Sequence, residues 1–225
     1  MQFPHTTDIL SLRNLTTMEI VLATRNRHKV NEIRAMLMDL PITILSLQDF
    51  PNAPEPEETG SSFAENAMMK ASAVSCATGK VALADDSGLE VDALDGKPGV
   101  YSNRFAGPKA TDRDKYLKVL DLMKNVPEPK RTARFRAAVA IAEPNGNVEV
   151  VEGTCEGIIA HKPRGHHGFG YDPIFYLPSI GKTMAELTPE EKNTISHRAC
   201  AIQKAKEILR RMVQKQDIDS QGSFG

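Results

Sequence analysis

The chain has 225 residues, and its 28 Lys and Arg against 29 Asp and Glu give a net charge of −1. This balance argues against a general binder of nucleic acid or membrane surfaces, because both normally require an excess of basic charge. The 40% hydrophobic content excludes wholesale disorder, and no run reaches the roughly 18 apolar residues of a membrane helix. Three widely spaced cysteines without a CxxC pair indicate a reducing, cytoplasmic compartment.

The patterned part of the chain extends over residues 18–213. Residues 1–17 show neither a sustained hydrophobic period nor the basic and apolar regions of a signal peptide, and residues 214–225 are mainly polar. We expect both ends to be disordered and either one domain of ordinary size or two small lobes that share a core to lie between them. Removal of residues 1–17 should therefore leave activity and stability nearly unchanged.

Strands and helices alternate in the first half of the chain. Residues 20–23 and 42–45 have strand character, and between them Val30, Ile33, Leu37 and Leu40 form one apolar helix face. An acidic, proline-rich loop at 51–60 precedes a helix with capping-box spacing at 62–65. In that helix the polar residues Ser62, Asn66 and Lys70 lie on one line.

The second half combines strands, one hairpin and further helices. A short strand at 81–84 is expected to end at the Asp85-Asp86-Ser87-Gly88 segment, followed by a strand and turn at 89–99 and a helix at 111–124. Two β-type runs at 134–142 and 148–154 flank an Asn-Gly turn. Residues 161–173 indicate a loop, and the last helix is expected from 194 to about 213. This order predicts an α/β fold with a mixed sheet.

Polar residues at the first strand-to-helix junction could bind phosphate. Thr24, Asn26 and Lys29 lie where free N–H groups and the positive end of the helix dipole point outward. Thr or Asn at this position is also typical of a plain helix cap, so this motif by itself leaves both readings open.

Two acidic pairs could bind a hard cation. Asp85 and Asp86 follow a strand, and ligands of open α/β sheets gather at the carboxyl ends of strands. Adjacent carboxylates repel each other unless a cation such as Mg²⁺ compensates them, although a solvated Asx turn is equally compatible. Glu57 and Glu58 could add an oxygen ligand or simply form an exposed acidic loop.

Two later segments could bind a base or an anion. The 168–173 loop has glycines that permit close backbone approach, with Phe169 and Tyr171 as flat faces for a purine. Lys192 with Ser196, His197 and Arg198 could read an anion or a carbonyl group. The competing interpretations are a loop that packs on the core and a solvated helical turn.

Several known motifs are excluded. The Gly181-Lys182-Thr183 segment lacks the first glycine of a Walker A loop, because position 176 is Tyr. The 168–173 loop fails the dinucleotide fingerprint, and Ser87 lacks the preceding glycine of a nucleophile elbow. The histidines at 161, 166 and 167 lack zinc-ligand spacing.

Five segments, in order, resemble the inosine/xanthosine triphosphate pyrophosphatases. They are ATRNRHKVNE (23–32), EETGSSFAENAMMKA (57–71), ALADDSGLEVDALDGKPGVYSNRFAG (82–107), GFGYDPIF (168–175) and AELTPEEKNTISHR (185–198). The resemblance covers residues 18–213. It implies two lobes around a long mixed sheet with flanking helices, an active site in the cleft between the lobes, a homodimer, and Mg²⁺-dependent hydrolysis of ITP, dITP and XTP to the monophosphate and pyrophosphate.

The resemblance also implies roles for individual residues. Asp86 would be the general base and a metal ligand, assisted by Asp85, while Lys29 and Lys70 would bind phosphates and either Glu57 or Glu58 would complete the metal site. The substrate-binding candidates are Thr24, Arg25, Asn26, Arg27, His28, Lys29, Ser87, Phe169, Gly170, Tyr171, Asp172, Lys192, His197 and Arg198. Of these, Arg198 is the candidate that reads the 6-oxo group, because a guanidinium only donates hydrogen bonds.

Two departures and two competing functions remain at this stage. Residues 1–17 have no counterpart in the family, and Arg25 stands where many relatives have glycine, so substrate preference is open to change. A different nucleotide hydrolase is one competitor, but the Nudix metal box is absent. A non-catalytic binder of nucleotides or RNA is the other, motivated by the basic stretch at 130–136, which is also compatible with a half-exposed strand.

Overall fold

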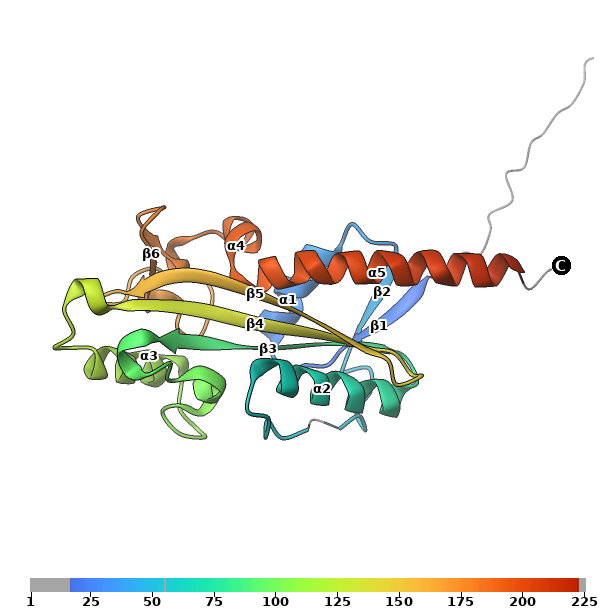
Figure 1. Ribbon diagram of the computed structural model, residues 1–225, viewed down its shortest axis with the longest axis horizontal. Helices are drawn as coiled ribbons and strands as arrows, with labels where there is room; N and C mark the ends of the chain where they lie inside the picture. Colours follow the sequence, from blue (N-terminus) through green and yellow to red (C-terminus); the bar gives the residue numbers. More distant parts are fainter. Residues whose placement is uncertain (1–16, 55, 223–225) are drawn as a thin grey trace, which may run out of the picture.

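The computed structural model describes residues 17–54 and 56–222, which form one mixed seven-stranded sheet with helices on both faces (Figure 1). The strand order is β2-β1-β3-β4-β5-β6-β7; β1 runs parallel to β2 and β3, and the later pairs are antiparallel. The strands are β1 (Met18–Leu22), β2 (Ile42–Ser46), β3 (Val81–Val91), β4 (Thr132–Ala142), β5 (Val148–Ile159), β6 (Phe175–Leu177) and β7 (Lys182–Thr183). The predicted α/β class with a mixed sheet is confirmed.

Helices cover the sheet in two layers. In Figure 1, α2 and α3 lie on one face, and α1, α4 and α5 lie on the other. The helices are α1 (Arg27–Leu37), α2 (Phe63–Thr78), α3 (Asp112–Leu122), α4 (Pro189–Ile195) and α5 (His197–Gly222). The 3₁₀ segments are η1 (Asp92–Leu94), η2 (Gly99–Arg104), η3 (Glu128–Lys130), η4 (Asp172–Ile174) and η5 (Met184–Glu186).

The alternation of strand side chains separates the core into distinct clusters. Leu83 of β3 packs in the cluster that α1 and α5 cover, whereas its neighbour Ala84 packs in the cluster under α2. A third cluster, which includes Phe135 and Phe175, fills the far end of β4 and β5 against α3. Because successive strand residues point to opposite faces, neighbouring residues of β3 pack under different helices and have different surroundings.

Strand β3 corrects the prediction for the acidic segment. Asp85, Asp86 and Ser87 lie in the middle of an 11-residue strand and pair with Val139, Ala138 and Ala137 of β4; they do not follow the end of a short strand. Local propensity favoured a turn because Asp, Ser and Gly are frequent in turns. The long antiparallel ladder with β4 outweighs that preference.

The C-terminal helix is also corrected. The chain forms two helices, α4 and α5, separated at Ser196, whose backbone is extended (φ −69°, ψ 159°). The Ser196 hydroxyl accepts a hydrogen bond from the Ala199 N–H at 3.1 Å and so caps α5. α5 then continues to Gly222, so residues 214–222 are helical where the sequence analysis expected disorder. A helix propagates readily once its first turns are packed, and the polar Gln and Lys residues after 213 are compatible with it.

Other local predictions are confirmed. Ser62 caps the start of α2, and Gly79, the C-cap residue that follows α2, has the left-handed φ of 66°. β4 and β5 form the hairpin around residues 144–147. The expectation for residues 1–16 lies outside the described residues. Among the described residues, no helix combines the length and the apolar content needed to cross a membrane.

Candidate active site

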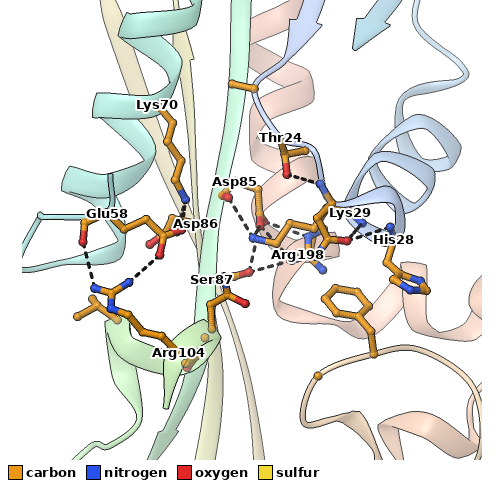
Figure 2. Close-up of a pocket in the computed structure, with 18 of the residues that line it drawn as sticks. Thr24, His28, Lys29, Glu58, Lys70, Asp85, Asp86, Ser87, Arg104 and Arg198 are labelled. Atoms are coloured by element: carbon orange, nitrogen blue, oxygen red, sulfur yellow. Dashed lines mark hydrogen bonds and ion pairs between the residues drawn. The ribbon is translucent and has the colours of Figure 1, made fainter. Parts of the chain in front are cut away.

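A cavity of about 630 Å³ opens where α1, α2, β3, η2, α3, α5 and the 169–172 loop meet (Figure 2). It brings together most of the residues singled out in the sequence. They are Thr24, Asn26, His28, Lys29, Glu57, Glu58, Lys70, Asp85, Asp86, Ser87, Phe169, Gly170, Tyr171, Asp172, Lys192, His197 and Arg198. Arg25 and Arg27 are exposed and do not line this cavity.

Asp85 points to the α5 side of β3 and is surrounded by cations. Its carboxylate accepts hydrogen bonds from Arg198 Nε and Nη2, both at 3.0 Å, and lies 2.7 Å from Lys29 Nζ. Ser87 Oγ also donates to Asp85, at 3.0 Å. Burial raises the pKa of Asp85, but the charges of Arg198 and Lys29 outweigh burial and hold this pKa far below its usual range. Asp85 is therefore a fixed negative charge that orients two cations.

Asp86 points to the α2 side of the same strand. Its Oδ1 lies 2.7 Å from Lys70 Nζ, and its Oδ2 accepts a hydrogen bond from Asn66 Nδ2 at 3.2 Å. Lys70 Nζ also contacts Glu58 Oε1 at 2.5 Å. Burial raises the pKa of Asp86, and the charge of Lys70 only partly offsets this effect. A carboxylate of raised pKa is a better proton acceptor than an ordinary one.

The start of α1 lies on the rim of the cavity. Asn26 is its N-cap, and the side-chain oxygen of Asn26 accepts hydrogen bonds from the N–H groups of His28 (2.9 Å) and Lys29 (3.3 Å). Thr24 Oγ1 accepts a hydrogen bond from the Asn26 N–H at 3.2 Å. The capping interpretation is thus correct for Asn26, and the same geometry presents Thr24, Asn26 and Lys29 to the cavity.

Phe169 presents an aromatic ring among basic side chains. The His28 ring stacks on it at a centroid distance of 5.2 Å, Lys192 Nζ lies 4.7 Å from its centroid and Arg198 Cζ lies 5.6 Å from it. Lys192 Nζ is itself held by Asp172 at 2.6 Å and Glu32 at 2.9 Å. This end of the cavity offers a flat apolar face together with fixed hydrogen-bond donors.

The two residues that begin α5, His197 and Arg198, differ in how many hydrogen bonds their side chains form. Arg198 is 1% exposed, and its bonds to Asp85, Glu32 and Ser87 use four of the five N–H groups of a guanidinium. His197 is also buried and stacks on Phe135 at 4.7 Å, but its Nδ1 has no hydrogen-bond partner among the described residues. Burial, followed by the charge of Arg198, lowers the pKa of His197 well below its usual value, so the ring is neutral at pH 7.

Five functional neighbours were missed in the sequence analysis. Glu32 holds both Arg198 and Lys192, Asn66 donates to Asp86, and Arg104, Asp112 and Lys115 line the cavity from η2 and α3. For two of them, the position in the sequence could have indicated a place in the site. Glu32 lies one helical turn after Lys29, and Asn66 belongs to the polar line of α2. The η2 and α3 residues have no such pattern, because only the fold brings them to the site.

The donor set near Lys70 fits a hard divalent cation. Glu58 and Asp86 direct carboxylate oxygens at the same ammonium group, so two acidic ligands converge on one point. Among the described residues no set of three or more acidic, His or Cys side chains forms a metal-binding group. Mg²⁺ characteristically binds through one or two carboxylates and completes its shell with water and substrate phosphates, so this pair is sufficient. Glu57 lines the cavity but is exposed.

Comparisons with known proteins give one consistent result. The model of the Ham1 family matches residues 20–208. A dITP/XTP pyrophosphatase of Desulforamulus reducens is 51% identical over 201 residues, which cover 89% of this chain and 100% of that protein. A dITP/XTP pyrophosphatase of Geobacillus kaustophilus is 54% identical over 189 residues, which cover 84% of this chain and 93% of that protein. The structure of a HAM1 protein from Coxiella burnetii superposes with a TM-score of 0.80 at 45% identity, covering 87% of this chain and 100% of that one. The chain belongs to the Ham1 family.

Proposed function

We propose that this protein hydrolyses the noncanonical purine nucleotides ITP, dITP and XTP to the monophosphate and pyrophosphate. The observation that carries the proposal is the division of one cavity into an aromatic end at Phe169 and a charged end at Lys29, Lys70 and Asp86. A purine requires a flat face and a triphosphate requires cations. The names of the Desulforamulus and Geobacillus relatives, both dITP/XTP pyrophosphatases, support the same activity.

The triphosphate is bound by the start of α1 and by two lysines. Thr24 and Asn26 offer polar groups beside the positive end of the helix dipole, and Lys29 adds a full charge. Lys70 faces the same space from α2 and binds the departing pyrophosphate. Both lysines form ion pairs with carboxylates, which orient them before substrate arrives.

Glu58 and Asp86 are the residues that would hold Mg²⁺. Glu58 takes this role in preference to Glu57, because its carboxylate converges with that of Asp86 on Lys70. When bound, Mg²⁺ polarises the phosphate oxygens and lowers the pKa of attacking water. We expect exhaustive chelation to abolish turnover and added Mg²⁺ to restore it; turnover that survives chelation would contradict this assignment.

Asp86 acts as the general base. A water molecule attacks the α-phosphorus, Asp86 accepts its proton, and the bond from the α-phosphorus to the bridging oxygen breaks. The reaction is a direct hydrolysis without a covalent enzyme intermediate. Asp85, which is fully engaged with Arg198 and Lys29, assists by holding these cations in place.

The nucleoside is bound at the aromatic end. Phe169 supplies a stacking face, and Tyr171 supports the loop because its hydroxyl donates to the Ser102 carbonyl oxygen at 2.7 Å. The remaining contacts come from Ser87, Gly170, Asp172, Lys192, His197 and Arg198. Four of the five N–H groups of Arg198 are already bonded, and the fifth is free to donate to the 6-oxo group, so Arg198 is the reader of that group.

The decisive experiment measures pyrophosphate and IMP released from ITP by the purified protein, with ATP as the control substrate. We expect equal amounts of the two products from ITP and little turnover of ATP. Binding of ITP without product formation would identify a non-catalytic nucleotide binder. Release of orthophosphate in place of pyrophosphate would identify a different hydrolase.

Two further properties complete the proposal. We expect a homodimer, which sedimentation at equilibrium checks as twice the mass of the chain. We also place the activity in the cytoplasm, where nucleotide pools are found. All three cysteines are free, as expected in that reducing compartment.

A further inference from the structure

Arg104 reaches the charged end of the cavity from the wall opposite Lys70. It is the last residue of η2, and its guanidinium donates from Nη1 to Glu58 Oε2 at 3.1 Å and from Nη2 to the Glu58 carbonyl oxygen at 3.0 Å. Figure 2 shows Arg104 and Lys70 on either side of Glu58 and Asp86. Arg104 thus joins a segment that follows β3 to the loop that precedes α2.

Glu58 is shared by two cations. Its Oε1 contacts Lys70 at 2.5 Å and its Oε2 contacts Arg104 at 3.1 Å, while Lys70 also binds Asp86 at 2.7 Å. The group contains two carboxylates and two cations and is therefore neutral before any phosphate enters. A metal ion that engages the two carboxylates would leave both cations available to an anion. Arg104 is then placed beside the lysine that we assign to the departing pyrophosphate.

Arg104 keeps donor capacity and access to solvent. The two bonds to Glu58 use two of the five N–H groups of a guanidinium, so three are left for a ligand. Its side chain is 39% exposed, and the guanidinium lies 5.0 Å from the centroid of the Tyr101 ring, which supports it from one side. The planar fork of a guanidinium matches two phosphate oxygens at once, which a lysine cannot do.

We propose that Arg104 is a further catalytic residue, which binds the β- and γ-phosphates and stabilises the pyrophosphate as it leaves. In the reaction, the water oxygen bonds to the α-phosphorus and the electron pair of the breaking bond moves to the bridging oxygen. The new negative charge therefore develops on the pyrophosphate. A positioned cation at this place lowers the energy of the transition state more than that of bound substrate. This inference rests on the proposed function.

The test compares Arg104→Gln, which removes the charge, and Arg104→Lys, which keeps the charge but not the fork. Arg113→Gln is the matched control, since Arg113 is exposed on α3 and does not line the cavity. Calorimetry measures the affinity of each protein for inorganic pyrophosphate in magnesium chloride and, separately, for IMP. Steady-state kinetics with ITP and thermal unfolding accompany the titrations.

We expect Arg104→Gln to weaken pyrophosphate binding about tenfold or more, to change IMP binding by less than about twofold, and to lower kcat for ITP about tenfold or more. Arg104→Lys should fall between Gln and wild type, and Arg113→Gln should match wild type. IMP lacks the β- and γ-phosphates, so its affinity reports the integrity of the rest of the site.

Unchanged pyrophosphate affinity in Arg104→Gln would overturn the proposal. Equal weakening of pyrophosphate and IMP, together with a lower melting temperature, would also overturn it, because Arg104 would then only tie η2 to the loop at Glu58. Failure of wild type to hydrolyse ITP would instead refute the proposed function. The two failures are distinguishable, because pyrophosphate binding by wild type is measured without turnover.

Discussion

Asp85 and Asp86 are adjacent in the chain but have different chemical environments. The alternation of β3 sends Asp85 toward Arg198 and Lys29 and sends Asp86 toward Asn66 and Lys70. The cations around Asp85 lower its pKa, whereas burial raises that of Asp86. One carboxylate therefore serves as a fixed charge and the other is suited to accept a proton.

This difference predicts that Asp86→Asn mainly affects catalysis and that Asp85→Asn mainly affects stability. Asp86→Asn should lower kcat for ITP by at least about 10²-fold with a small change in melting temperature, because it would remove the proposed general base and one of the two proposed metal-binding charges. Asp85→Asn should instead lower the melting temperature strongly, because it leaves Arg198 and Lys29 without their shared partner. Kinetics and thermal unfolding of both variants check this pair. An Asp86→Asn enzyme with wild-type kcat would exclude Asp86 as the base.

A substitution of Arg198 would affect its ion pairs and its proposed contact with the base together. Its removal disrupts the bonds to Asp85 and Glu32 as well as any contact with the base. The ratio of kcat/KM for ITP and ATP separates these effects, because a general loss of activity lowers both values equally. A donor opposite position 6 bonds a carbonyl and is left unsatisfied by an amino group, at about 1–3 kcal/mol or more when charged.

We therefore expect Arg198→Ala to narrow the ratio of kcat/KM for ITP and ATP by about 10²-fold, mainly through loss of ITP turnover. Rejection of guanine, which also has a 6-oxo group, is expected to depend on the 168–172 loop. A comparison of ITP, XTP, GTP and ATP measures both effects. If the ITP to ATP ratio stays constant, the reader is His197 or a loop N–H group.

At the scale of elements, the start of α5 is positioned by close contact with β5. Gly153 of β5 lies under the helix, and a Cβ atom at this position would lie 2.2 Å from the His197 carbonyl oxygen and 2.4 Å from the Ala201 nitrogen. Both are backbone atoms, so the helix would have to move to make room. The same turn carries His197 and Arg198, so the position of the helix decides the geometry of the site.

Gly153→Ala should therefore reduce both stability and activity. We expect a loss of about 1–3 kcal/mol in unfolding free energy and a fall of about tenfold or more in kcat/KM for ITP, because displaced side chains no longer meet the substrate. Urea unfolding and steady-state kinetics well below the melting temperature provide the measurements.

Gly157→Ala on the same strand is the matched control. Its Cβ would meet Phe175 and the Tyr176 carbonyl oxygen at 2.7 Å, away from α5. It should lose stability and keep kcat/KM within about threefold. Similar kinetic losses in both variants would show that the site depends on the packing of β5 in general and not on the contact of α5 with Gly153.

At the scale of the whole molecule, the buried His197 couples the folded state to pH. Its pKa in the folded protein is lowered, first by burial and then by the charges of Arg198, Lys192 and Lys29, which outweigh the opposing charge of Asp85. The unfolded chain takes up a proton at this residue below about pH 6.5, and the native state does not. The unfolded state then binds more protons, so stability is complete above about pH 6.5 and falls as the pH decreases.

We expect wild type to lose up to about 1.4 kcal/mol of unfolding free energy per pH unit between pH 6.5 and 5 from this one group, and His197→Gln to lose less over the same range. Carboxylates with lowered pKa, such as Glu32, contribute at lower pH. Urea unfolding at several pH values measures the slopes. His161→Gln, at an exposed loop position, should keep the wild-type slope. A wild-type slope in His197→Gln would disprove the assignment.

Much of the fold was predictable because its signals are local. The apolar period of α1, the Ser62 and Gly79 boundaries of α2 and the Asn-Gly hairpin between β4 and β5 all appear within short stretches of sequence. Local signals failed where long-range contacts outweighed them. The ladder with β4 keeps Asp85 and Asp86 extended, and the extended backbone of Ser196 separates α4 from α5.

The sequence by itself determined the candidate residue types of the site. Thr24, Lys29, Lys70, Asp86 and the segments around them form an ordered set, and the resemblance of this set to a pyrophosphatase family predicted phosphate, metal and purine chemistry. Only the tertiary structure decided their partners. It assigned Asp85 to Arg198 and Asp86 to Lys70, selected Glu58 over Glu57 as the converging acid, and brought Arg104, Asp112 and Lys115 to the cavity. The physical reason is that side-chain partners are set by which face of a strand or helix a residue occupies and by what packs there, and these contacts join residues far apart in the chain.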